Sequence, residues 1–346
     1  MNDNDRKDVY RIEHFLAGLF LCFFLALLLF MIIVPDFHSK AALWKARIHG
    51  KNEWPITSKI SDDVKEDGFI FELPEDIGID NIKVSTSLRA GESVLKVDGI
   101  DAAYPEDYKL KGKSKVVRDV YFSYEQEQAR IKFKLNSMFE PIVKVSNDKL
   151  YINFKNANEV YRKIILIDAS LGGDQKGVEF NGSCEKDINL AVVKKAKKII
   201  DKEKPADTKV YYTRLKDETI SEEKRITMLN ESMADYFVSV GLNSTSSGRI
   251  SDMKGISTYY MSTNPKSKSL AVSYLDSLVT ETSGANRGII PGDNNRILEA
   301  TNKVSILVKL GFATNGEERE LLTQKDYQDK LARGLANAVL NSIKGE

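Results

Sequence analysis

The chain has 346 residues, 42% of them hydrophobic, which is enough for about two domains with separate cores. Its 51 Lys and Arg residues nearly balance its 50 Asp and Glu residues, so the net charge is +1. This balance, without any basic stretch interleaved with aromatic residues, argues against nucleic acid as a partner. The two cysteines, Cys22 and Cys184, are too few for a disulfide framework.

Residues 15–34 form an uncharged apolar run that ends before Pro35. About 20 residues at a rise of about 1.5 Å match the hydrocarbon thickness of a bilayer, about 30 Å. The run therefore predicts a membrane-spanning helix, preceded by a short cytoplasmic tail over 1–14. The alternative is a cleaved signal peptide, which the small residues Ser39 and Ala41 suggest, but the run is longer than the usual hydrophobic region of such a peptide.

Positive charges flank the predicted span on both sides, so the distribution of Lys and Arg leaves its orientation open. Before the span are Arg6, Lys7 and Arg11, and after it are Lys40, Lys45, Arg47 and Lys51. The short tail and the large following region favour a single-pass protein of the cell membrane whose C-terminal domains are extracytoplasmic. A polar linker is expected over 35–67.

Apolar and polar residues alternate in several short runs after this linker. The runs are separated by Gly, Asp, Asn and Pro and lie at 68–73, 82–86, 93–97, 116–124, 129–135 and 150–154. Alternation with a period of two, bounded by turn-forming residues, is typical of strands. The pattern predicts a small all-β sandwich over 68–158, and none of its residues suggests catalysis.

From residue 163 onwards, expected strands alternate with expected helices. This order predicts an α/β domain over 163–346 with a mostly parallel sheet flanked by helices. The expected strands lie at 164–167, 209–213, 236–240 and 304–308, and the expected helices at 185–202, 221–232 and 324–344. Ligand sites of such sheets lie at the carboxyl ends of the strands, which directs attention to 168–173, 239–243 and 309–315.

These segments resemble those of the zinc-dependent N-acetylmuramoyl-L-alanine amidases, the amidase type 3 family, over about 163–343. The family pattern I-D-P-G-H-G-G aligns with 167–173, and E-K-x-x-N-L aligns with 185–190. Three further family elements persist: T-R at Thr213 and Arg214, R…N at Arg225 and Asn230, and G-F-x-x-N at 311–315. The resemblance implies the amidase fold and a relation to peptidoglycan.

The departures from the family pattern lie at the positions of its zinc ligands and its catalytic glutamate. The resemblance places zinc ligands at Leu171, Glu185 and Gly241 and the catalytic glutamate at Lys309, and only Glu185 is retained. All three histidines of the chain, His14, His38 and His49, precede the domain. A catalytic zinc needs about three protein ligands and a water. We therefore expect no zinc, no other cofactor and no catalytic residue here.

An alternative metal site would combine Asp168 and Asp174 with Glu185. Hard cations bound by such oxygen ligands generate hydroxide at neutral pH less readily than zinc. The preferred interpretation is that the Lys309 ammonium occupies the volume of the metal and forms an ion pair with Glu185. The alternative is that Lys309 extends to solvent. Cys184 has no histidine in its domain to activate it and is expected to be an inert thiol.

Retained polar residues are the candidates for binding substrate: Arg214, Arg225, Asn230, Asn243 and Asn315. The alternative for each is a role in holding loops together. The segments 120–124 and 151–154 of the β-region resemble AMIN-type domains that precede many bacterial amidases, which implies targeting to the wall or the division site. A spacer sandwich is the alternative.

Together these features predict a cell-wall-associated pseudo-amidase that binds peptidoglycan or regulates wall remodelling. One alternative is an active N-acetylmuramoyl-L-alanine amidase with an unrecognised mechanism, because function depends on the site and not on the fold. The other is a membrane-anchored scaffold for a cell-wall or division protein.

Overall fold

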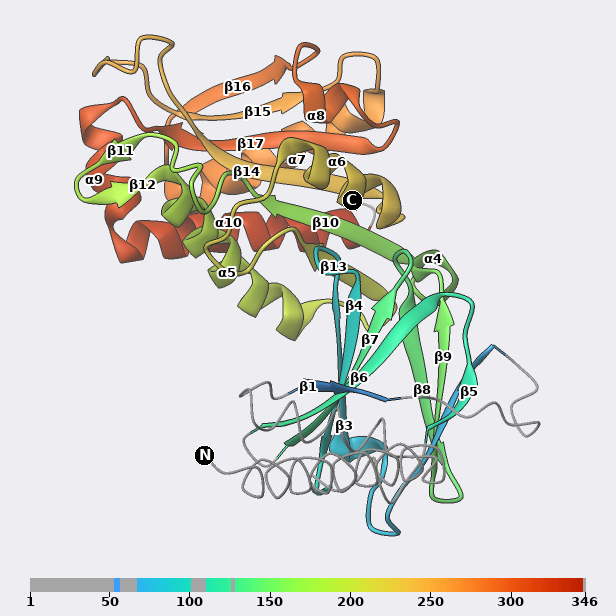
Figure 1. Ribbon diagram of the computed structural model, residues 1–346. Coiled ribbons are helices and arrows are strands. Elements are labelled where there is room, and N and C mark those ends of the chain that lie inside the picture. The colour runs from blue at the N-terminus through green and yellow to red at the C-terminus, as the bar shows by residue number, and fades with distance from the viewer. Residues whose placement is uncertain (1–52, 57–66, 101–109, 126–127, 345–346) are drawn as a thin grey trace, which may run out of the picture. The chain divides into compact units, whose positions relative to one another are not determined.

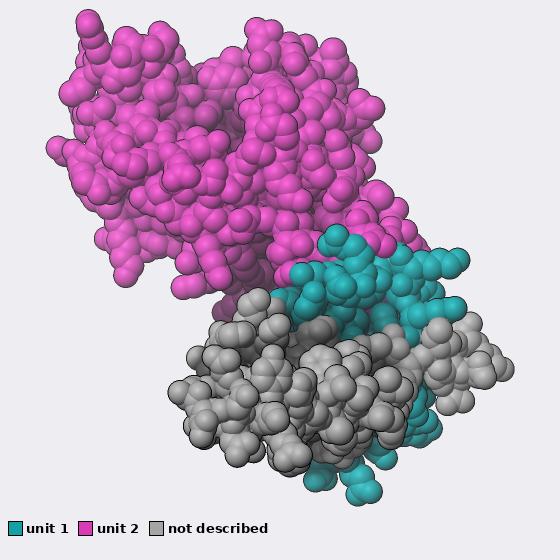
Figure 2. Space-filling view, in the orientation of Figure 1, with its two compact units in different colours: residues 1–85, 94–134, 143–153 teal, residues 86–93, 135–142, 154–346 magenta. Residues whose placement is uncertain are grey.

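The computed structural model describes residues 53–56, 67–100, 110–125 and 128–344. The predicted membrane span at 15–34 and the tail before it lie outside these residues. Within the described part of the chain, every helix is too short or too polar to cross a bilayer. The chain divides into two compact units (Figure 2): residues 1–85, 94–134 and 143–153 form the first, and 86–93, 135–142 and 154–346 form the second. The predicted domain boundaries stay predictions.

The β-region contains a five-stranded sheet in the order β1-β6-β7-β4-β3 and a four-stranded sheet in the order β5-β2-β9-β8. The strands are β1 (Glu53–Pro55), β2 (Gly68–Glu72), β3 (Ile82–Ser87), β4 (Glu92–Asp98), β5 (Lys111–Lys113), β6 (Val117–Glu125), β7 (Gln128–Leu135), β8 (Glu140–Ser146) and β9 (Lys149–Lys155). All six expected runs are strands. Strands β1, β5 and β8 were not predicted.

Alternating burial explains why these sequences form sheets. Along β7, every second side chain from Ala129 to Leu135 is buried. The ring of Phe69 in β2 lies 5.5 Å from that of Phe133 in β7, centroid to centroid, so the two sheets pack against each other.

The second unit contains a six-stranded sheet in the order β13-β10-β14-β17-β15-β16 (Figure 1). Its strands are β10 (Lys163–Ala169), β13 (Thr208–Tyr212), β14 (Tyr236–Asn243), β15 (Ile256–Tyr260), β16 (Asn286–Pro291) and β17 (Val304–Phe312). The pairs β13/β10, β10/β14 and β14/β17 are parallel, and β15 runs antiparallel to β17. The predicted mostly parallel sheet is confirmed. The short strands β11 (Glu179–Phe180) and β12 (Ser183–Cys184) form a separate ribbon.

Helices cover both faces of this sheet. Ile165 and Ile167 of β10 share one core with α5 (Glu185–Glu203), α7 (Pro265–Thr282) and α10 (Lys325–Lys344), and Figure 1 shows α5 and α10 along the same side of β10. The alternate residues of β10, Ile164 and Leu166, pack with α6 (Glu222–Glu231) and α8 (Arg296–Glu299) in a second core. The remaining helices are the short α4 (Ala157–Val160), the 3-10 turn η1 (Ile79–Asn81) and α9 (Gly316–Thr323).

Two strands are longer than predicted, which corrects the expected position of the strand ends. Strand β14 continues to Asn243 and β17 to Phe312, so 239–243 and the first part of 309–315 lie within the sheet. Gly241 pairs with Lys309, but Asn243 pairs with Phe312, so β17 carries one extra residue between these pairs. Gly311 adopts φ +149° at this bulge, a backbone conformation that favours glycine.

The buried carboxylate of Glu318 in α9 closes this bulge. It accepts hydrogen bonds from the backbone N–H groups of Phe312 (2.7 Å) and Gly255 (2.9 Å). A Cβ at Gly311 would lie 3.2 Å from Glu318 Oε2. A side chain at this position would therefore be strained by the backbone conformation and would crowd Glu318.

Replacing Gly311 by Ala should lower the free energy of unfolding by about 1–3 kcal/mol, because alanine is strained at this φ and crowds Glu318. Chemical denaturation would measure the change. Gly316→Ala is the matched control, since nothing lies within 4 Å of its Cβ position, and it should change stability by about 0.5 kcal/mol or less. Equal effects of the two substitutions would contradict the role assigned to the bulge.

Candidate functional site

Three side chains from different elements converge on Gly241 of β14. A Cβ at residue 241 would lie 2.7 Å from Ser170 Oγ, 3.2 Å from Lys309 Nζ and 3.6 Å from Glu185 Oε1. Ser170 follows β10, Lys309 lies beside Gly241 in β17, and Glu185 is the first residue of α5. We call Ser170, Glu185, Gly241 and Lys309 the Gly241 site.

Glu185 is buried, with 8% of its surface exposed, and both of its carboxylate oxygens face backbone donors. Oε1 accepts from the N–H of Leu242 (3.0 Å), and Oε2 accepts from the N–H of Val178 (3.4 Å). Its place at the start of α5 adds the favourable field of the helix amino terminus. These contacts stabilise the negative charge without a metal ion.

Lys309 lies close to Glu185 without forming an ion pair with it. Its Nζ donates to the carbonyl oxygen of Leu242 (2.9 Å), and no Nζ-to-carboxylate distance to Glu185 falls within the 4.0 Å of an ion pair. Burial lowers the pKa of Lys309, and the Glu185 carboxylate partly opposes this shift. Lys309 Nζ and Glu185 Oε1 lie near the same Cβ position of Gly241, but the predicted direct ion pair is wrong, and occupation of the metal's volume stays a prediction. The reason is that the backbone of Leu242 contacts both groups, donating to one and accepting from the other.

Leu171 lies beside the same carboxylate. Its Cδ1 and Glu185 Oε2 both lie against Gly177, at 2.5 Å and 2.6 Å from the position of a Cβ there. Leu171 adopts φ +64°, and its carbonyl oxygen accepts from Arg225 Nη2 (2.7 Å). Its backbone is therefore held in the turn after β10, and its methyl group packs against Gly177 beside Glu185.

The side chains at these positions do not fit zinc. Residues 171, 241 and 309 supply a methyl group, a hydrogen atom and an ammonium, and none of these is a zinc ligand of the ordinary kind. Within the described part of the chain, no three His, Cys, Asp or Glu side chains are grouped so that they could hold a metal ion. Asp174, which the alternative metal site would require, is exposed and accepts from Thr219 Oγ1 (3.2 Å).

Asp168 is fully buried beside the site and accepts from three side chains. Thr213 Oγ1 donates at 2.6 Å and Ser239 Oγ at 2.7 Å, and Arg225 forms a buried ion pair with the same carboxylate. These partners come from the end of β13, from β14 and from α6. Asp168 and Arg225 are therefore occupied in holding the strand ends together.

Arg214 is 1% exposed, and its guanidinium donates to backbone carbonyl groups. The acceptors include Ala169 (2.8 Å), Ser170 (3.1 Å) and Lys186 (2.8 Å). These bonds attach the turn after β10 to the first turn of α5. The geometry of Arg214 and Arg225 thus favours the loop-holding alternative, and contact with substrate stays a prediction.

The three candidate asparagines occupy different surroundings. Asn230 is exposed on α6, whereas Asn243 is buried and donates to Ser257 Oγ (2.9 Å). Asn315 caps α9, where its Oδ1 accepts from the N–H of Glu318 (3.0 Å) and its Nδ2 donates to the carbonyl of Ser251 (3.2 Å). Binding of substrate by each of them stays a prediction.

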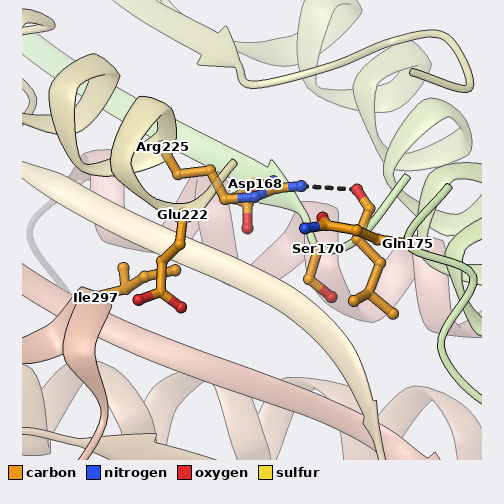
Figure 3. Close-up of a pocket in the computed structure, with 7 residues that line it drawn as sticks. Asp168, Ser170, Gln175, Glu222, Arg225 and Ile297 are labelled. Atoms are coloured by element: carbon orange, nitrogen blue, oxygen red, sulfur yellow. Dashed lines mark hydrogen bonds and ion pairs between the residues drawn. The ribbon is translucent and has the colours of Figure 1, made fainter. Parts of the chain in front are cut away.

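A pocket of about 270 Å³ opens beside the Gly241 site. It is lined by Asp168, Ser170, Leu171, Gln175, Glu222, Arg225 and Ile297 (Figure 3). Sequence reasoning missed Ser170, Gln175, Glu222 and Ile297. Of these four residues, only Ser170 could have been found from the sequence, because the aligned family pattern has glycine at this position.

Cys184 precedes α5, and its thiol lies 3.8 Å from Glu179 Oε2. Burial and the Glu179 carboxylate raise the pKa of this thiol. A raised pKa reduces the thiolate fraction and therefore the reactivity at neutral pH. This environment fits the expected inert thiol.

Asp168→Ala should lower the free energy of unfolding by about 3–5 kcal/mol, because it leaves Arg225 buried without its counter-charge. Urea denaturation of the purified chain would measure this. The exposed Asp174→Ala is the control and should change stability by about 0.5 kcal/mol or less. A small effect at Asp168 would mean that Arg225 has another acceptor.

The pH dependence of stability should reveal the lowered pKa of the partly buried Lys309. The pKa of Lys309 in the folded chain lies below the ordinary value of 10.5. At a pH between these two values, Lys309 is therefore mostly protonated in the unfolded chain and mostly deprotonated in the folded chain. The free energy of unfolding therefore rises with pH in that window. Melting temperatures measured from neutral pH towards 10.5 should rise for the wild type relative to Lys309→Met. A constant difference would contradict the shift.

Comparison with known proteins places residues 165–341 in a recognised family, whose model is described as N-acetylmuramoyl-L-alanine amidase. The chain is 31% identical over 185 residues to the uncharacterized protein YqiI of Bacillus subtilis, covering 53% of this chain and 86% of that protein. It is 27% identical over 186 residues to the N-acetylmuramoyl-L-alanine amidase LytC of the same organism, with 53% of this chain and 36% of LytC covered.

A crystal structure of an N-acetylmuramoyl-L-alanine amidase from Clostridium difficile 630 is also similar. It shares 32% identity and a TM-score of 0.49 with this chain, over 53% of this chain and 98% of that one. The match of the family model to about half of the chain agrees with the motifs and the sheet described above. The chain belongs to the N-acetylmuramoyl-L-alanine amidase family.

Proposed function

We propose that this chain is a peptidoglycan-associated pseudo-amidase of the cell membrane. In this proposal a single N-terminal helix anchors the chain, its C-terminal domains are extracytoplasmic, and it binds peptidoglycan or regulates wall remodelling without cleaving the wall. The observation that carries the proposal is the Gly241 site. An ammonium, a hydroxyl and a residue without a side chain surround the one retained carboxylate.

The chemistry of amide hydrolysis supports the proposed inactivity. Zinc in hydrolases lowers the pKa of a bound water from 15.7 to about 7, which supplies hydroxide at neutral pH. The residues at 171, 241 and 309 do not fit this metal. The position of the family's glutamate holds Lys309, so the carboxylate that would act as the general base is absent.

Membership of the family supports the proposed association with peptidoglycan. The buried contacts of Asp168 and Arg214 keep the strand ends in place, and a pocket persists beside them. The AMIN-like character of the β-region and its targeting role belong to this proposal too.

Binding to the wall should be saturable. Full-length protein in mild detergent, mixed with increasing amounts of purified peptidoglycan, should sediment with the wall, and soluble wall fragments should compete for it. The supernatant should contain no newly released stem peptide, with or without added zinc.

Two other results of these experiments would each favour a different function. Release of stem peptide that is lost in Glu185→Ala would establish an active amidase. Absence of binding, with a stoichiometric protein captured from digested walls, would instead favour the scaffold.

Restoring the family's residues should give tighter zinc binding if Ser170 changes as well. A side chain at 241 meets Ser170 Oγ at 2.7 Å, so Leu171→His, Gly241→His and Lys309→Glu leave the new histidine crowded. Adding Ser170→Gly should tighten zinc binding about tenfold over the triple variant, as measured by calorimetry. Equal affinities would show that Ser170 rotates away without cost.

A further inference from the structure

Helix α5 carries an unbalanced row of lysine side chains on its exposed face. Residues 194–204 contain six Lys and two acidic residues, although the whole chain has 51 basic and 50 acidic residues. The apolar side of α5 is buried in the core of the second unit, whereas Lys194, Lys198 and Lys202 are exposed. We call these three residues the α5 lysine stripe.

Two acids next to this face are taken by lysines outside the stripe. Asp329 of α10 pairs with Lys195 (2.6 Å), and Asp201 pairs with Lys197. Among the described residues, no carboxylate oxygen lies within the 4.0 Å of an ion pair from any stripe lysine. The charge of the stripe is therefore directed to solvent without a counter-ion from the protein.

The spacing of the stripe makes its charges repel one another. Successive members are four residues apart, so they are neighbours on the surface of the helix. The helix dipole favours cations in the last turn, which accounts for Lys202, and the exposed Glu203 adjoins the same residue. Neither effect accounts for Lys194 and Lys198. An anionic surface placed against the stripe would supply the missing counter-charge.

A phospholipid bilayer is the anionic surface expected near this chain. The segment 194–204 has no aromatic residue on which nucleic-acid bases could stack. The uncharged run 15–34 predicts a membrane span, and 18 residues, 35–52, separate it from Glu53 of β1. Even fully extended, this connection spans only about 60 Å, so the folded part of the chain stays near the bilayer. Lys side chains close to a membrane are attracted by anionic lipids.

We propose that the α5 lysine stripe binds the anionic phospholipid surface of the membrane that anchors the chain. The choice of a membrane rests on the anchor in the proposed function. Because the core occupies the apolar side of α5, the contact is made by charges at the bilayer surface and not by insertion of the helix. High salt therefore weakens it. Such binding gives the second unit a fixed side towards the membrane.

Energy transfer in liposomes tests this inference. The full-length chain with Cys22→Ala and Cys184→Ser carries a donor dye at Ala206→Cys, an exposed position just after α5. It is reconstituted into liposomes that contain acceptor-labelled lipid. Transfer should be higher in phosphatidylcholine mixed with phosphatidylglycerol than in phosphatidylcholine alone, and high salt should abolish this difference.

Removing the stripe charges should abolish the difference between the two lipid mixtures as well. Glutamine has nearly the helix propensity of lysine, so the fold is kept, which circular dichroism would verify. The stripe variant is Lys194→Gln/Lys198→Gln/Lys202→Gln. The matched control removes three exposed lysines elsewhere and should behave as the wild type does: Lys216→Gln/Lys266→Gln/Lys268→Gln. Equal transfer in both lipid mixtures by the wild type would overturn the inference, as would an unchanged difference in the folded stripe variant.

An alkaline carbonate wash of the same liposomes tests the anchor separately. Protein that stays with the liposomes supports the anchor, and the comparison of transfer then decides the inference alone. If the wash releases the protein, the anchor in the proposed function fails, and flotation of the unanchored chain with phosphatidylglycerol vesicles tests the stripe. About 100-fold weaker flotation affinity of the stripe variant would then support the inference, and equal affinity would overturn it.

Discussion

The buried carboxylate of Asp168 is the interaction on which the arrangement of the candidate site depends. It accepts hydrogen bonds from Thr213, which follows β13, and from Ser239 in β14, and it forms an ion pair with Arg225 of α6. Arg225 also donates to the carbonyl oxygen of Leu171, so the turn after β10 is held by a buried guanidinium. Removing any partner would leave another polar group buried without one, so these contacts hold this edge of the sheet together.

Around Gly241, backbone groups contact both charged side chains. The Glu185 carboxylate accepts hydrogen bonds from two backbone N–H groups, and Lys309 Nζ donates to a backbone carbonyl. Ser170 fills the space that a side chain at 241 would need. Ser170, Lys309 and Glu185 therefore lie close together around a residue that has no side chain of its own.

The sequence predicted the elements whose patterns are long and regular. Helices α5 and α10 and strands β7 and β10 show sustained periodicity and lie close to the expected ranges. Strand β8 was missed because its sequence does not alternate, and α7 and β15 were missed because no family motif drew attention to them.

At the site, the family motifs identified the residues at 171, 185, 241 and 309, because a retained or replaced motif residue can be read directly from the sequence. The position of Leu242 between two charged groups was not predictable, since it depends on backbone direction at a bulge near Gly311. For the same reason the sequence suggested an ion pair where the structure has two separate backbone contacts.

The most direct test of the central claim is a zinc titration of the wild-type chain compared with Glu185→Ala. Calorimetry with the full-length protein in detergent would report any zinc bound at the Gly241 site as the difference between the two proteins, because histidines elsewhere in the chain are common to both. The account predicts identical titrations. One equivalent of tightly bound zinc that disappears in Glu185→Ala would contradict it and would return this protein to the metal-dependent amidases.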